Sequence, residues 1–371
     1  MSDTSGVGHS RPRVLFVGRT RYRLPLEGPL ARKWDALADV FDLRVLASGS
    51  GHDPRFALIG RRPLDGPHFY ATLPLRVAYE LRRFRPHAVI AQSPFEAALS
   101  ILALRSTGSR AKLVIEIHGD WHTATRLYGS PARILLAPLA DRTALRALRR
   151  ADAIRAVSQF TAELVREAGR EADAVFTAYT DLGVFAGPVE PVPVEPNVLF
   201  VGVLERYKDV EGLAAAWREL ARRLPEARLH VVGNGRQVEV AEALQREGVR
   251  WDRRLGQAEV AAALDESRAL VLPSASEGLP RIAVEAFLRG RPVVATRAGG
   301  TPEIVQHDVT GLLVERGDPA ALADALERVL RDRELAQRLG DAAYAAATRF
   351  LTTPEDFAAA FRKLVDSVLA P

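Results

Sequence analysis

Two glutamates stand eight positions apart in the stretch SEGLPRIAVE, which runs from Ser276 to Glu285. Glu277 follows the apolar run ALVLPS (269–274) and precedes a Gly-Leu-Pro step, whereas Glu285 lies in the apolar-periodic stretch RIAVEAFLRG. The pattern predicts a buried strand, a loop and a helix, with Glu277 on the loop and Glu285 about one turn into the helix. Carboxylates at both positions can accept hydrogen bonds from hydroxyl groups.

The predicted helix start between these glutamates can bind an anion. Gly278, Leu279, Arg281 and Ile282 carry backbone N–H groups there, and Pro280 has none, although its fixed φ suits a first helical turn. The positive end of the helix dipole favours a phosphate at this place. An anion site with a carboxylate on each side suits a nucleotide sugar, which has hydroxyl groups at both ends. The alternative is an ordinary helix-start charge and a surface charge.

Short β-branched runs alternate with amphipathic stretches along most of the sequence. The strand candidates are 13–18, 42–48, 87–93, 112–119, 153–158 and 174–179 in the first half, and 197–203, 228–233, 249–255, 269–274, 292–297 and 311–315 in the second. This alternation predicts an α/β protein with parallel sheets covered by helices on both faces. Ligands of such sheets lie beyond the carboxyl ends of the strands, so the segments that follow strands are candidate sites.

A proline-rich stretch, GPVEPVPVEPN (187–197), interrupts this alternation because its four prolines cannot continue a helix or a central strand. It divides the predicted strands six and six. We therefore predict two Rossmann-like, doubly wound domains that face each other across a cleft. The predicted parts are a first domain at 1–187, a linker at 188–197, a second domain at 198–350, and a terminal helix at 351–371 that packs back toward the first domain.

Composition limits the chemistry. The 371 residues include no cysteine, which excludes disulfides, thiolate nucleophiles and cysteine-bound zinc. The N-terminal segment MSDTSGVGHSRPR is polar, and no apolar run is long enough to span a bilayer, so we expect a soluble, cytoplasmic protein.

Positive charge is concentrated in the first half. Residues 1–190 contain 27 Lys and Arg and 19 Asp and Glu, a net charge of +8, whereas the remaining residues have a net charge of −3. Such a field favours an anionic partner, either a phosphorylated acceptor, a membrane surface or a nucleic acid, the last being least favoured. The alternative is a set of solvated arginines without a partner.

Four segments of the second half occur in an order that is typical of one enzyme family. They are FVGVLERYKD, HVVGNG, LVLPSASEGLPRIAVEAFLRGRPVVATRAGGTPEIV and TGLLVERGDP, and the third contains the E-x7-E spacing of Glu277 and Glu285. The sequence resembles retaining glycosyltransferases of family 4, which have the GT-B fold. The resemblance implies that Glu277 contacts hydroxyls of the transferred sugar, that Glu285 contacts the ribose, and that backbone amides of 278–282 meet the diphosphate.

The resemblance also implies contacts with the rest of the donor. Lys208 matches a lysine that binds the donor phosphates, but Val203 stands where many relatives have a second cation, an arginine. Arg206 either replaces that arginine or is solvated. Trp251 and Arg253 occupy the place where relatives hold the base, largely through the backbone.

In the first half, Gly18 ends a predicted strand where relatives have a glycine-rich loop beside the donor phosphate. The loop predicted to follow it holds five basic residues, which either bind an anionic acceptor or are solvated. These are Arg19, Arg21, Arg23, Arg32 and Lys33.

His118 ends the predicted strand KLVIEIHG, at a position where relatives have a histidine near the anomeric centre. The resemblance implies that His118 orients the donor sugar, although a lone histidine at a strand end can also be a hydrogen-bonded structural residue. Asp120 is a nearby alternative and a candidate contact for the acceptor.

The segment 126–150 carries arginines next to an apolar stripe. They are Arg126, Arg133, Arg142, Arg146, Arg149 and Arg150. The segment is either an interfacial surface for anionic lipid, which would attach the protein to the inner face of the cell membrane, or a covered helix with a basic outer face.

These patterns predict a retaining glycosyltransferase that moves a hexose-type unit from a nucleoside-diphosphate sugar to an acceptor. The donor is expected to bind the second domain and the acceptor the first. No D-x-D sequence occurs, so we expect neither a metal nor another cofactor. A sugar-nucleotide epimerase, or an inactive nucleotide-sugar-binding protein with the same fold, is the alternative.

Overall fold

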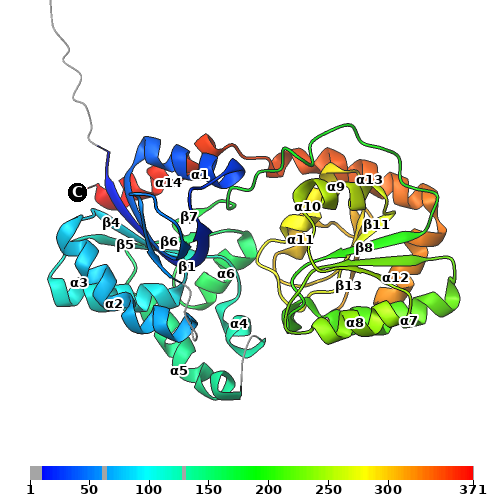
Figure 1. The fold of residues 1–371 in the computed structure, drawn as a ribbon, viewed down its shortest axis with the longest axis horizontal. Coiled ribbons are helices and arrows are strands. Elements are labelled where there is room, and N and C mark those ends of the chain that lie inside the picture. The colour runs from blue at the N-terminus through cyan, green and yellow to red at the C-terminus, as the bar shows by residue number, and fades with distance from the viewer. Residues whose placement is uncertain (1–10, 61–64, 128–130, 371) are drawn as a thin grey trace, which may run out of the picture.

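The computed structural model describes residues 11–60, 65–127 and 131–370 of the chain, which form two α/β domains side by side (Figure 1). The first contains a seven-stranded sheet and the second a six-stranded sheet, and all strand pairs are parallel. The predicted fold class is confirmed.

The first sheet has the strand order β3-β2-β1-β4-β5-β6-β7. Its strands are β1 (Arg13–Arg23), β2 (Asp42–Ser50), β3 (Phe56–Ile59), β4 (Ala88–Ala91), β5 (Lys112–Ile117), β6 (Ala153–Ala156) and β7 (Ala174–Val175). Its helices are α1 (Gly28–Val40), α2 (Asp65–Arg83), α3 (Pro94–Thr107), α4 (Trp121–Leu127), α5 (Pro131–Leu148) and α6 (Gln159–Glu167). The sequence analysis predicted six strands here and missed β3.

The second sheet has the order β10-β9-β8-β11-β12-β13. Its strands are β8 (Asn197–Val201), β9 (Arg228–Val232), β10 (Arg250–Asp252), β11 (Ala269–Leu272), β12 (Val293–Thr296) and β13 (Gly311–Val314). Its helices are the 3-10 turn η1 (Arg206–Lys208), α7 (Val210–Arg223), α8 (Val238–Arg246), α9 (Gln257–Asp265), α10 (Arg281–Leu288), α11 (Thr301–Ile304), α12 (Pro319–Arg331), α13 (Arg333–Ala347) and the 3-10 turn η2 (Thr348–Phe350).

Both sheets reverse their winding once. β1 lies between β2 and β4, and β8 lies between β9 and β11, so the chain winds toward one edge of each sheet and then toward the other. In open parallel sheets the loops that follow the two central strands diverge at this point and leave room for a ligand. In the second sheet these are the loops after β8 and β11, which contain Lys208 and Glu277.

The prediction of a loop directly after Gly18 is wrong. β1 continues to Arg23 beside β2, with a register shift between Val17 and Arg21. Arg19, Arg21 and Arg23 therefore lie on an extended strand. The continuous apolar run of β1 ends at Val17, and polar residues follow Gly18. A prediction from hydrophobicity therefore ended the strand too early.

Arg32 and Lys33 were also assigned to that loop, and both lie on α1 instead. Lys33 Nζ lies 5.1 Å from the ring centroid of Phe357, a residue of the last helix.

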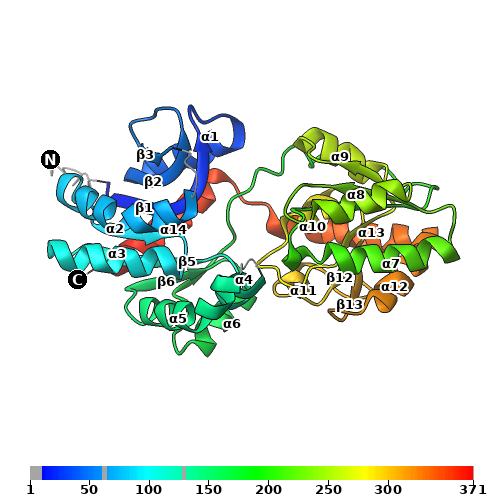
Figure 2. The same cartoon turned by 60° about the horizontal axis from the view of Figure 1, so that its bottom comes forward.

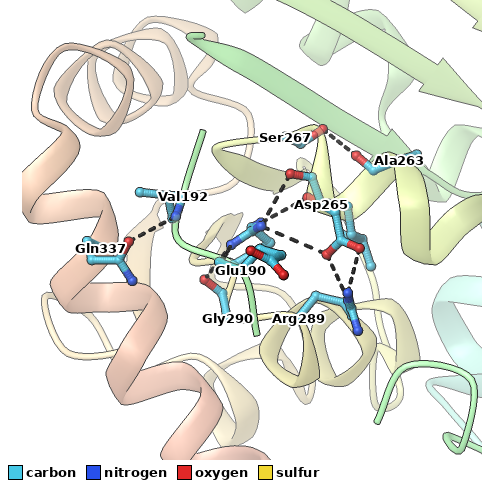
Figure 3. A network of polar contacts seen from close by, with 10 residues as sticks. Glu190, Val192, Ala263, Asp265, Ser267, Arg289, Gly290 and Gln337 are labelled. Atoms are coloured by element: carbon cyan, nitrogen blue, oxygen red, sulfur yellow. Dashed lines mark hydrogen bonds and ion pairs between the residues drawn. The ribbon is translucent and has the colours of Figure 1, made fainter. Parts of the chain in front are cut away.

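The proline-rich segment is fixed to the second domain. Arg291, which is fully buried, donates from Nη1 to the carbonyl oxygen of Glu190 at 2.8 Å. The backbone N–H of Val192 donates to Oε1 of Gln337, a residue of α13, at 2.9 Å. Figure 3 shows Val192 beside Gln337, and Glu190 near the Arg289–Asp265 ion pair. The segment is thus a rigid part of the second domain from Glu190 onward.

The last helix, α14 (Pro354–Leu369), returns to the first domain and lies beside α1 (Figures 1 and 2). Phe357 and Phe361 of α14 are buried in the same apolar cluster as Phe16 of β1 and Trp34 of α1. The first domain's core on this face of the sheet is therefore completed by the end of the chain.

Candidate active site

Lys208 and Glu277 form an ion pair where the loops after β8 and β11 meet. Lys208 Nζ lies 2.5 Å from Glu277 Oε1, and the Ser274 hydroxyl donates to the same oxygen at 2.6 Å. Lys208 is 8% exposed and Glu277 is 9% exposed, so the pair is largely removed from water. The resemblance implied separate ligand contacts for the two residues, and the structure brings them into direct contact.

The loop of Glu277 is held from both sides. The N–H of Ala275 donates to the carbonyl oxygen of Tyr207 at 2.7 Å, and the N–H of Gly300 donates to the carbonyl oxygen of Glu277 at 3.0 Å. Gly299 has φ of +54°, and a Cβ there would lie 1.8 Å from that same carbonyl oxygen. Only glycine allows this approach, which explains the Gly-Gly pair after β12.

Helix α10 begins at Arg281, as predicted. Within the part of the chain that the structure describes, the N–H groups of Gly278, Leu279, Arg281 and Ile282 donate no hydrogen bond. Pro280 is the N-cap and supplies no donor. Four donors at the positive end of a helix dipole are thus available to an anion.

Glu285 lies on the inner face of α10 and is 7% exposed. Its carboxylate lies 3.6 Å from the Arg281 guanidinium. Burial raises the pKa of Glu285, and the Arg281 charge only partly offsets this. A buried carboxyl with one distant cation is well suited to hydrogen bonding with a ligand hydroxyl.

The first domain contacts the loop of Glu277 at Gly278. A Cβ at Gly278 would lie 2.0 Å from the carbonyl oxygen of His118, and the Ser158 hydroxyl donates to the carbonyl oxygen of Gly278 at 3.1 Å. Nearby, the Glu303 carboxylate accepts the N–H of Gln159 at 2.9 Å and the N–H of Phe160 at 2.6 Å, at the start of α6. The two domains therefore meet directly over the candidate anion site.

His118 follows β5, and its side chain is 44% exposed. His118 Nε2 lies 3.5 Å from Oε1 of the buried Glu116. Glu116 pairs in register with Arg155 on β6, and the two side chains form a buried ion pair. The Arg155 guanidinium also lies 4.2 Å from the ring centroid of Phe176. The buried Glu116, held in place by Arg155, thus fixes the orientation of the His118 ring through its contact with Nε2.

A cavity of about 20 Å³ borders this cluster and is lined in part by Lys33, Gln92, Glu116, His118 and Arg155. Burial alone would raise the pKa of Glu116, but the hydrogen bond from His118 and the charges of Arg155, His118 and Lys33 outweigh it and lower this pKa to about 2.

Replacement of Glu116 by glutamine is expected to change the response of stability to acid. A carboxyl with a lowered pKa stabilises the fold above its unfolded value of 4.5, and this contribution is lost as pH falls toward about 2. The stability advantage of wild type over Glu116→Gln should shrink by about 3 kcal/mol across that window. Urea unfolding of the first domain at a series of pH values measures this difference. For the control Glu171→Gln, whose side chain is 72% exposed, the free energy of unfolding should depend on pH as in wild type. The prediction would be contradicted if the free energy of unfolding fell equally with pH in wild type and Glu116→Gln.

The other predicted donor contacts are more dispersed. Arg206 is exposed and forms no ion pair among the described residues. Trp251 donates from Nε1 to the carbonyl oxygen of Gly233 at 3.0 Å, and Arg253 lies 4.7 Å from its ring centroid. The Gln92 side chain fills the space beside Gly18, because a Cβ at Gly18 would lie 1.9 Å from Gln92 Oε1.

The predicted acceptor contacts come from two segments of the first domain. Arg19 lies 6.0 Å from the ring centroid of Tyr70, and Arg19, Arg21 and Arg23 are exposed along β1. Asp120 accepts the N–H groups of His122 at 2.8 Å and Thr123 at 3.2 Å, at the start of α4. Its carboxylate is thus used locally.

Several residues of the site were not singled out from the sequence. Ser274, Ser158 and Glu303 are polar residues directly after strands or in the first turn of a helix, and only the strand order shows that they converge. Glu116 and Arg155 had a usable signal, since each is a charged residue within an otherwise apolar predicted strand. Opposite charges in two consecutive buried strands indicate a pair.

The comparisons with known families match each half of the chain separately. Residues 190–346 match the family described as glycosyl transferases group 1, and residues 30–180 match glycosyltransferase family 4. Each half of the chain thus matches a glycosyltransferase domain family, and the two domains together have the GT-B fold. Among solved structures, sucrose-phosphate synthase from Thermosynechococcus elongatus aligns with 97% of this GT-B chain and 100% of its own, with a TM-score of 0.76 and 21% identity. Anabaena HepE, in complex with UDP and glucose, aligns with 97% of this chain and 100% of its own, with a TM-score of 0.70 and 19% identity.

Sequence relatives match this chain over shorter lengths. D-inositol 3-phosphate glycosyltransferase of Corynebacterium diphtheriae is 33% identical over 172 residues, which cover 43% of this chain and 40% of the relative. The alignment thus spans about two fifths of that relative's length. N-acetyl-alpha-D-glucosaminyl L-malate synthase of Bacillus anthracis is 27% identical over 272 residues, which cover 70% of this chain and 66% of the relative.

Proposed function

We propose that the protein transfers a hexose-type unit from a nucleoside-diphosphate sugar to an acceptor, with retention of anomeric configuration and without a metal. The observation that supports this most is the buried Lys208–Glu277 pair at the start of α10. The backbone N–H groups of Gly278, Leu279, Arg281 and Ile282 there donate no hydrogen bond among the described residues. Cation, amide donors and carboxylate together suit a diphosphate joined to a sugar. The names of the relatives, and the UDP and glucose bound to HepE, agree with this ligand class.

In this proposal the second domain holds the leaving group. The Lys208 ammonium and the N–H groups at the start of α10 stabilise the negative charge that develops on the diphosphate as the glycosidic bond breaks. The Glu277 carboxylate accepts hydrogen bonds from sugar hydroxyls, and Glu285 accepts them from the ribose. Arg206 supplies a second cation in place of the arginine that Val203 replaces.

The first domain supplies the other wall. His118, oriented by Glu116, lies on the opposite side of Gly278 and positions the sugar near its anomeric carbon. Contact between the domains excludes water from this region, which favours transfer over hydrolysis. The basic character of the first domain favours an anionic acceptor.

Among the described residues no group of three or more potential metal ligands occurs.

The test has two steps. Thermal unfolding with UDP-, GDP-, ADP- and dTDP-sugars, each with and without EDTA, should show one nucleotide series that raises Tm, because ligand binding stabilises the folded state by mass action. With that donor and candidate anionic acceptors, release of the nucleoside diphosphate should depend on the acceptor, and NMR of the product should show the donor's anomeric configuration. Inversion of configuration, dependence on a metal, or turnover of the donor without any acceptor, as in an epimerase, would reject the proposal.

A further inference from the structure

Helix α5 presents its largest side chains to solvent. Leu135 is 81% exposed, Leu136 is 56% exposed and Leu139 is 58% exposed. The buried residues in the described part of α5 are Ala137, Ala144, Ala147 and Leu148. The second half of α5 is thus a covered helix with a basic outer face, as the second alternative predicted. The first half differs, because a helix that only covers a core keeps its leucines inside.

The neighbouring helix α3 extends this apolar surface. α3 packs beside α5 in the layer that covers one face of the first sheet (Figures 1 and 2). Leu102 of α3 is 54% exposed. Several exposed leucines on two helices that pack against each other indicate an interaction surface. We call these four leucines and the exposed arginines next to them the α3–α5 surface.

The charge of the α3–α5 surface is strongly positive. Its exposed arginines, which form no ion pair among the described residues, are Arg105, Arg110, Arg142, Arg146, Arg149 and Arg150. The acidic residues of α3, α4 and α5 are already engaged: Glu96 is 4% exposed and accepts from the Tyr70 hydroxyl, and Asp141 pairs with His122 at 2.8 Å and Arg126 at 3.0 Å. Residues 128–130 and the side chain of Arg133 lie outside the described residues.

We propose that the α3–α5 surface docks on a lipid bilayer that contains anionic lipids. Leucines gain free energy by entering the acyl boundary of a bilayer, and guanidinium groups around them bind lipid phosphates. A nucleic acid would match the arginines but would leave the leucines in water. No helix among the described residues is long and apolar enough to cross a membrane, so the contact is peripheral.

The position of this surface relates to the candidate active site. α4 follows the strand end at His118 and precedes α5 in the sequence, and it contacts η1 of the second domain, the turn that contains Lys208. A bilayer on the α3–α5 surface would therefore contact the domain to which the acceptor is assigned. Docking itself does not depend on the proposed transfer, so its test requires no turnover.

Cosedimentation with vesicles tests the docking. Wild-type protein should pellet with vesicles of phosphatidylcholine and phosphatidylglycerol, but not with phosphatidylcholine alone, and salt should weaken the binding. The double variant Leu135→Glu, Leu139→Glu should lose about ten-fold or more of the partition coefficient, because both apolar contacts are removed. The variant Arg146→Gln, Arg149→Gln, Arg150→Gln should bind more weakly and with a smaller salt dependence.

The control is Val194→Glu, because Val194 is 69% exposed in the linker that is fixed to the second domain. It should bind vesicles like wild type, and Tm values of all variants should stay close to wild type since every replaced side chain is exposed. Equal vesicle binding by wild type and the leucine variant, or no binding by wild type, would overturn the proposal. Binding to single-stranded or duplex DNA that depends on the arginines but not on the leucines, without vesicle binding, would instead assign the surface to nucleic acid.

Discussion

Replacement of Lys208 by methionine is expected to lower kcat/KM by about 10²- to 10³-fold. That range is typical when one preorganised group that stabilises a developing negative charge is removed. Methionine keeps most of the volume of the aliphatic part of the side chain, so the main change is the loss of the ammonium group 2.5 Å from Glu277. Steady-state kinetics with the donor found by the Tm screen, at saturating acceptor, measure the effect.

A second variant separates catalysis from folding. Lys208→Met leaves the Glu277 carboxylate buried without a cation, which should also reduce the free energy of unfolding by about 3 kcal/mol. The double variant Lys208→Met, Glu277→Gln removes both charges and should recover most of that stability while staying inactive. Lys112→Met provides a matched comparison because its ion pair with Asp152, at 3.1 Å, involves side chains that are 44% and 34% exposed. If Lys208→Met kept wild-type kcat/KM, the assignment of Lys208 to the donor phosphates would be wrong.

Replacement of Gly278 by alanine is expected to reduce kcat/KM by about 100-fold, because the new methyl group would push the two domains apart. The new Cβ would lie 2.0 Å from the backbone carbonyl oxygen of His118, so the domains would have to separate by more than an ångström. Misplacement of this size in a site that spans two domains costs about 10²-fold in rate. Tm should change little because each domain keeps its own core. Small-angle scattering should show a larger radius of gyration.

Gly119→Ala is the control for this variant. Gly119 lies on the other side of the same contact, but a Cβ there would come no closer than 3.9 Å to Gly278 Cα, which is an ordinary contact. Scattering of Gly119→Ala should match that of wild type, and its kcat/KM should fall far less than that of Gly278→Ala. A Gly278→Ala protein that remained as compact and as active as wild type would show that the catalytic form does not use this contact.

The fold was largely predictable because local pattern determines it. Twelve strands were predicted, and the described residues form thirteen. β3 (Phe56–Ile59) was missed because its run FALI contains a single β-branched residue, Ile59, and so gives a weak strand signal. β1 was cut short because its second part, from Arg19 to Arg23, carries three exposed arginines and therefore lacks the apolar pattern of the first part.

Lys208, Glu277 and Glu285 of the candidate site could be named from the sequence, whereas Ser274, Ser158 and Glu303 could not. The geometry of the site could not be predicted either. The N–H groups at the start of α10 follow from helix chemistry, so they could be derived from the sequence alone. Contact between Lys208 and Glu277 depends on β8 and β11 being neighbours, which periodicity does not report. The approach of His118 to Gly278 depends on how two domains are docked, and no local signal encodes that.

The chain crosses between the domains twice, and this has a mechanical consequence. The first crossing becomes rigid from Glu190, where Arg291 fixes it to the second domain, and the second passes through residues 351–353 before α14 inserts Phe357 and Phe361 into the first domain. Two connections at separate points define an axis. They permit rotation of one domain about the line between them and oppose sliding or twisting in other directions. We therefore expect the C-terminal helix to act as the second pivot of a hinge, so that an opening and closing of the domains would return His118 along the same arc to Gly278.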